Sequence, residues 1–168
     1  NSGSIVLNNE KIVDSNILDY KKHLGYMPEY LNLYPELILE DLLYFLYNIK
    51  NLNHNNVEYL LDVLNLNSYR RMKIKMLSKG TKQRLNLAQS LLGNPKIVIF
   101  DEPSNGFDCL SIEIFYKLLN ELTNLGSIVI LTSHHLKEIY GKVDVLSFLS
   151  KGVITKVLNY KDVFLDKV

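Results

Sequence analysis

The chain has 168 residues, of which 47% are hydrophobic and 22% are charged, and its formal net charge is +1. These values are typical of one globular domain with a substantial core, and the charge gives no electrostatic case for binding nucleic acid. The single cysteine excludes an internal disulfide framework, and no apolar run reaches the roughly 18 residues of a membrane-spanning helix.

The first third of the chain predicts short strands followed by helices. Residues 4–7 form a strand pattern that ends in an Asn-Asn turn, and a short helix is expected over 17–23. Residues 25–28 read as the edge of a strand. Residues 40–50 and 57–64 carry apolar side chains at helical spacing, so they predict two amphipathic helices.

Two groups of side chains in this helical part leave alternatives open. The tyrosines suit either a groove that receives a partner's helix or the packing of a small helical core; they are Tyr26, Tyr30, Tyr34, Tyr44 and Tyr47. The basic run over residues 70–75 is interpreted as a solvated face, with contact to anionic lipid headgroups as the alternative.

A phosphate-binding helix start is predicted near residue 78. Ser78 is a good N-cap, and Leu85, Ala88 and Leu92 recur at helical spacing after it. Gly80 lets the backbone approach a ligand closely. The free amide groups and positive dipole of such a helix start suit a phosphate, although the same pattern is also an ordinary structural cap.

The central feature of the sequence is the run Ile-Val-Ile-Phe at residues 97–100, followed by Asp101, Glu102 and Pro103. Consecutive β-branched residues predict a parallel strand buried on both faces, and ligands bind outside the carboxyl ends of such strands. If strand geometry continues, the two carboxylates point to opposite faces, so one can hold a cation and the other can act on water. The alternative is a solvated acidic turn.

The last third of the chain predicts further strands around one long helix. Apolar residues at helical spacing over 110–125 predict this helix, and residues 127–131 predict another buried strand. Residues 143–149 and 153–157 predict a strand pair that finishes the sheet, and a short helical tail is expected from Tyr160.

Five segments, taken in order, resemble the nucleotide-binding domain of ATP-binding cassette (ABC) transporters. Residues 25–29 resemble its Q-loop, 77–81 its signature loop and 97–102 its Walker B strand. Residues 104–108 resemble the D-loop, and 132–135 resemble the switch-histidine loop. The matches cover nearly the whole chain in the order of the family.

The resemblance implies an α/β fold with a P-loop NTPase-like parallel sheet core flanked by helices. It further implies an inserted helical subdomain and an N-terminal β-hairpin remnant. Residues 1–168 would then be a single nucleotide-binding domain fragment. Within it, residues 30–93 form the helical subdomain with the signature loop, and residues 94–168 form the Walker B portion of the core.

The resemblance also implies roles for individual residues. Asp101 and Glu29 would hold Mg²⁺, Glu102 would act as general base on the attacking water, and His134 rather than His135 would contact the γ-phosphate. Glu29 stands where the family most often has Gln, so a solvated loop residue is the alternative there.

Residues of the signature loop and D-loop would bind nucleotide across a dimer interface. Ser78, Lys79 and Gly80 would meet the γ-phosphate of ATP that is bound by a partner domain, and Asp108 would link the two sites. Lys79 departs from the family pattern, which often has Gly at this position.

The phosphate-cradling pattern Gly-x4-Gly-Lys-Ser/Thr does not occur in the 168 residues, and the Gly141-Lys142 pair is followed by Val143. We expect the sequence to be a fragment rather than a natural truncation. The 168-residue polypeptide alone is therefore predicted to show no ATPase activity.

The resemblance therefore implies the ATP-hydrolysing subunit of an ABC transporter, with ATP and Mg²⁺ as cofactors. Its expected partners are a second nucleotide-binding domain and a transmembrane permease, and its expected location is the cytoplasmic side of the membrane. Two alternatives remain: a non-catalytic signature-bearing module that pairs with a complete ATPase, and a soluble ABC ATPase acting on ribosomes or in DNA repair.

Overall fold

A computed structural model describes residues 3–7, 9–30, 34–139 and 141–159. The chain divides into two compact units, Asn1–Thr132 and Ser133–Val168, and each has its own sheet structure. The helical tail that was predicted from Tyr160 lies outside the described residues. No helix among the described residues is both long and apolar enough to cross a membrane.

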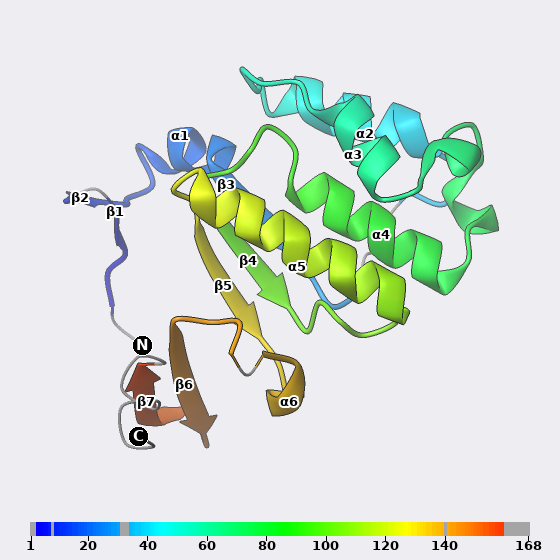
Figure 1. Cartoon of the computed structure of the whole chain (residues 1–168). Helices are drawn as coiled ribbons and strands as arrows, with labels where there is room; N and C mark the ends of the chain where they lie inside the picture. Colours follow the sequence, from blue (N-terminus) through cyan, green and yellow to red (C-terminus); the bar gives the residue numbers. More distant parts are fainter. Residues whose placement is uncertain (1–2, 8, 31–33, 140, 160–168) are drawn as a thin grey trace. The chain divides into compact units, whose positions relative to one another are not determined.

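The first unit is built on a parallel sheet of three strands, β3 (Leu24–Met27), β4 (Ile97–Asp101) and β5 (Ile128–Thr132) (Figure 1). The strand order is β3-β4-β5, so the predicted central strand lies in the middle. This arrangement confirms the predicted parallel α/β core.

The two faces of this sheet are buried to different extents. Val98 and Phe100 are fully buried beneath α4 (Lys79–Ser90) and α5 (Cys109–Asn124). On the opposite face, Ile128 and Ile130 remain 54% and 51% exposed. The prediction that both strands are buried on both faces is therefore wrong for the described residues, because α4 and α5 cover only one side of the sheet.

The helical segment begins with α2 (Leu39–Ile49) and α3 (Val57–Val63), followed by the 3₁₀ turns η1 (Asn67–Tyr69) and η2 (Ile74–Met76). Both α-helices begin and end within one residue of the predicted bounds. Their buried leucines join those of α4 in one core because each helix has its apolar residues on a single stripe.

The basic run is exposed but tied to two carboxylates. Arg70 Nε lies 2.6 Å from the carboxylate of Glu40, and Arg71 pairs with the same group. Two lysines of the run pair with Glu36 at 3.1 and 2.7 Å. These ion pairs join the run to the start of α2, so it is more than the solvated face that the sequence suggested.

Small elements complete the two units. In the first, β1 (Val6–Leu7) and β2 (Glu10–Lys11) form the predicted N-terminal hairpin, and α1 (Ile17–Lys22) precedes β3. In the second, α6 (Leu136–Ile139) precedes the antiparallel pair β6 (Val145–Ser150) and β7 (Val153–Asn159). The strand pair was predicted correctly, but the prediction that it finishes the sheet is wrong, because β6 and β7 pair only with each other among the described strands.

Candidate functional site

A threonine hydroxyl joins the carboxyl ends of β4 and β5. Asp101 is the last residue of β4 and pairs in register with Thr132. Thr132 Oγ1 donates a hydrogen bond of 2.7 Å to Asp101 Oδ1 and accepts one of 3.0 Å from the Glu102 amide. The carboxylate of Asp101 is thereby fixed at the edge of the sheet where α/β proteins bind ligands.

The backbone of Glu102 adopts a left-handed conformation with φ of +47°. Strand geometry therefore ends at Asp101. The alternation of side chains along a strand does not extend to Glu102, so it does not place the carboxylates of Asp101 and Glu102 on opposite faces of the sheet. A non-glycine residue in this region stores about 1–3 kcal/mol of strain, and such residues gather at functional sites. The Oε2 atom of Glu102 is shielded from solvent, which makes it a partly desolvated carboxylate beside Asp101.

Residues 102–108 form a compact loop, here named the connecting loop. The Asn105 amide donates to the Glu102 carbonyl at 3.2 Å. At the other end of the loop, Asp108 caps α5 by accepting a 2.8 Å hydrogen bond from the Ser111 amide. Hydrogen bonds from the Ser111 side chain and amide lower the pKa of Asp108, so its carboxylate stays charged at the helix start.

The start of α4 contacts the connecting loop. Ser78 Oγ caps the helix by accepting a 3.1 Å hydrogen bond from the Thr81 amide. A Cβ atom on Gly106 would lie 3.4 Å from Lys79 Cε, and one on Gly80 would lie 3.6 Å from the Gly106 carbonyl oxygen. The segments that resemble the signature loop and the D-loop therefore lie side by side within one chain.

Glu29, just beyond the carboxyl end of β3, reaches the same loop. Asn105 Nδ2 donates to Glu29 Oε1 over 3.4 Å. A hydrogen bond with Glu29 also raises the pKa of the Tyr30 phenol. Glu29 thus has a hydrogen-bonding partner in the connecting loop, whereas the alternative interpretation expected a solvated loop residue.

His134 and His135 belong to the second unit. Both side chains are exposed, their ring centroids are 3.9 Å apart, and the His135 amide donates a 3.0 Å hydrogen bond to Ser133 Oγ. The first unit therefore contains the acidic pair, Glu29 and the start of α4, whereas the histidine belongs to a separately described part.

The carboxyl edge of the sheet offers oxygen ligands of the kind that Mg²⁺ prefers. Asp101, Glu29 and the Thr132 hydroxyl supply oxygen atoms that can bind a metal ion there. Within the described residues, no group of three or more His, Cys, Asp or Glu side chains could hold a metal by itself. This donor set fits Mg²⁺ that takes its remaining ligands from nucleotide phosphates and water.

Sequence reasoning assigned no role to two residues that organise this site. Thr132 becomes important through its register with Asp101, and Asn105 through its contact with Glu29. Both residues lie in segments that resemble loops of the family, and this resemblance is the sequence feature that could have pointed to them. Their partners are 31 and 76 positions away in the chain, so local patterns did not reveal the contacts.

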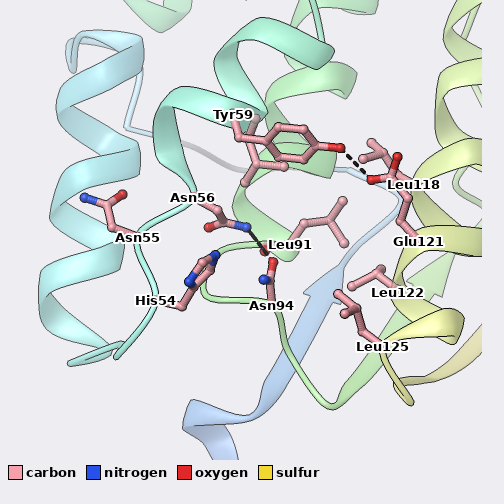
Figure 2. A pocket seen from close by; sticks show the side chains of 11 residues that line it. His54, Asn55, Asn56, Tyr59, Leu91, Asn94, Leu118, Glu121, Leu122 and Leu125 are labelled. Atoms are coloured by element: carbon pink, nitrogen blue, oxygen red, sulfur yellow. Dashed lines mark hydrogen bonds between the residues drawn. The ribbon is translucent and has the colours of Figure 1, made fainter.

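A hollow of about 400 Å³ lies between α3 and α5, away from the acidic pair (Figure 2). Tyr59 of α3 donates a 2.5 Å hydrogen bond to Glu121 of α5 across it, which raises the pKa of Tyr59 to about 12. Asn56 binds the Leu91 carbonyl, Asn94 and the Gly93 amide there. These contacts connect α3 to α5 and to the segment that follows α4, so the hollow is a structural junction.

The family model described as ABC transporter matches residues 1–105. The chain therefore belongs to the ABC transporter family, in agreement with the acidic strand end and the capped helix start.

Two relatives illustrate the match. An uncharacterised ABC transporter ATP-binding protein of Methanocaldococcus jannaschii is 33% identical over 133 residues, covering 77% of this chain and 51% of the relative. The Nod factor export ATP-binding protein I of Rhizobium etli is 31% identical, covering 79% of this chain and 43% of the relative. The chain spans about half the length of the curated relatives that it matches.

Solved structures agree with this fold. An ATP-binding subunit of an ABC transporter is similar with a TM-score of 0.87 and 26% identity, covering 98% of this chain and 70% of that chain. A dimeric ATP-binding cassette bound to ADP and phosphate in a post-hydrolysis state gives a TM-score of 0.79 at 19% identity, covering 95% and 74%. The second likeness shows the fold alone.

Proposed function

We propose that the protein containing this chain hydrolyses ATP to drive an ABC transporter. The observation that carries the proposal is the end of β4, where Thr132 fixes Asp101 and a left-handed backbone sets Glu102 beside it. Glu102 would accept a proton from the water that attacks the γ-phosphate. Bound Mg²⁺ would neutralise charge on the phosphates, with Asp101 and Glu29 holding it, directly or through water.

The start of α4 would serve the nucleotide of a second domain. Ser78, Lys79 and Gly80 lie at the capped end of a twelve-residue helix, whose amide groups and dipole favour an anion. Asp108 lies at the far end of the adjoining connecting loop. We propose a head-to-tail dimer in which His134 and the acidic pair of one domain face the helix start of the other.

A phosphate-cradling loop is still required for catalysis. Nothing in residues 1–168 has the required pattern, and the exposed face of the sheet carries half-exposed Ile128 and Ile130. We propose that a further segment of the protein packs there and supplies the loop, which would bury these isoleucines. We also propose that residues 30–93 form the helical subdomain and that residues 94–168 form the Walker B portion of the core.

A transmembrane permease is the proposed second partner. Tyr30 and Tyr34 are 72% and 68% exposed, whereas Tyr44 and Tyr47 pack against the core. The two interpretations of the tyrosines therefore apply to different residues, and the exposed pair suits docking of a helix from a partner. This arrangement would place the domain on the cytoplasmic side of the membrane.

Replacing the proposed general base tests the proposal. In the protein as its gene encodes it, Glu102→Gln keeps the size of the side chain but removes the proton acceptor. We expect ATP hydrolysis to fall by about 10²–10⁴-fold while ATP still binds. Glu113→Gln, on the exposed side of α5, is the matched control. Hydrolysis by Glu102→Gln at the rate of the control would refute the assignment.

The absent phosphate-loop pattern favours one second candidate function, a non-catalytic module that completes the site of another ATPase. In that case the encoded protein would hydrolyse no ATP alone. It would stimulate hydrolysis by a partner, and Ser78→Ala would reduce this stimulation. In both cases the 168-residue polypeptide by itself is expected to be inactive.

A further inference from the structure

A side-chain amide of the connecting loop donates a hydrogen bond to Glu29. An ionised carboxylate can only accept hydrogen bonds, so its orientation depends on donors nearby. Asn105 Nδ2 donates to Glu29 Oε1 over 3.4 Å. Asn105 is 76 positions away from Glu29 in the sequence and belongs to the connecting loop.

The position of Asn105 is itself set by neighbouring contacts. Its amide donates to the Glu102 carbonyl at 3.2 Å. The next residue, Gly106, has a φ of +91°, and the aliphatic stem of Lys79 packs against it. A Cβ atom at Gly106 would meet Lys79 Cε at 3.4 Å. The loop is therefore held between the proposed general base and the start of α4.

We infer that Asn105 is a positioning residue that holds Glu29 through its side-chain amide and so couples the end of β3 to the connecting loop beside Glu102. The inference rests on the proposed function. Glu29 would then keep one orientation toward Mg²⁺ and nucleotide. A displacement of Glu29 would also displace the connecting loop, which carries Glu102.

An experiment can exchange the hydrogen-bond donor and acceptor of the contact between residues 29 and 105. In Asn105→Asp, two carboxylates would face one another without a donor, so they repel. In the Glu29→Gln background, the same substitution places an acceptor opposite the glutamine amide, and a hydrogen bond can form again. A structural effect of Asn105→Asp on its own loop would be equal in both backgrounds.

The test is a double-mutant cycle at positions 29 and 105 in the protein as its gene encodes it. The measurements are kcat and KM for Mg-ATP, the Kd for Mg-ATP by calorimetry, and the thermal unfolding midpoint. We expect Asn105→Asp to lower kcat/KM about tenfold with Glu29 present and less than about threefold in the Glu29→Gln background. Asn120→Asp, an exposed substitution on α5, is the matched control for the added charge.

Three results would overturn the inference. One is an equal loss in both backgrounds, and another is no loss with Glu29 present. The third is coupling in the unfolding midpoint without coupling in Kd or in kcat/KM, because the contact would then be structural only. Absence of ATP hydrolysis in the unsubstituted protein would instead refute the proposed function, and the cycle on Kd for Mg-ATP would still decide the role of Asn105.

Discussion

The buried carboxylate of Glu40 is expected to contribute strongly to stability. Glu40 is in the first turn of α2 and only 4% exposed. Arg70 Nε lies 2.6 Å away and Arg71 pairs with the same carboxylate. The Glu40 amide also donates to the Arg70 carbonyl at 3.1 Å, so side chain and backbone together join α2 to the basic run.

The magnitude follows from the exposure of each partner. Arg70 is 32% exposed, and a hydrogen bond to a charged group in such a place is worth about 1.5–3 kcal/mol. Arg71 is 79% exposed, so its pair contributes about 0–1 kcal/mol. The favourable interaction of Glu40 with the dipole of α2 adds about 0.3–1 kcal/mol. Glu40→Gln should therefore lower the free energy of unfolding by about 2–5 kcal/mol.

Glu58→Gln is the matched control because Glu58 pairs with the same Arg70 at 2.9 Å but is 60% exposed. Its substitution is expected to cost less than about 1 kcal/mol. Urea unfolding, followed by circular dichroism at constant salt, measures both variants. A loss for Glu40→Gln no larger than that for Glu58→Gln would refute the argument from burial.

Two further predictions concern the room for a side chain at Gly25 and the pH dependence of stability. A Cβ atom at Gly25 would lie 2.0 Å from the Ser90 carbonyl oxygen, so Gly25→Ala should destabilise the protein by about 3 kcal/mol or more. Gly3→Ala, with nothing within 4 Å, should be neutral in the same urea assay. The lowered pKa of Asp108 means that its stabilisation is complete above pH about 4 and is lost as the pH falls further. Asp108→Asn keeps a cap without titrating, so its unfolding midpoint should fall less steeply below pH about 4; an unchanged acid dependence would contradict this.

Local patterns in the sequence were sufficient for most elements of the fold. The spacing of apolar residues determines α2, α3 and α5, because a helix must bury one stripe of its surface. Ser78 and Asp108 were identified by side-chain type and by family resemblance. Both cap helices in the structure, since a short oxygen-bearing side chain can reach the free amides of the next turn.

Long-range contacts explain what the sequence left open. The basic run has no local carboxylate partner, and it is the fold that brings it to Glu40 and Glu36. The uneven burial of the two sheet faces depends on where α4 and α5 pack, although the strand sequence is apolar throughout.

The sequence by itself determined that an acidic pair ends a central parallel strand and that a capped helix start precedes it in the chain. Tertiary structure decided how these parts meet. Strand register brings Thr132 to Asp101, and the left-handed turn at Glu102 directs the connecting loop toward Glu29 and Lys79. The physical reason is that periodicity and capping depend on neighbours within one or two turns, whereas these contacts join residues tens of positions apart.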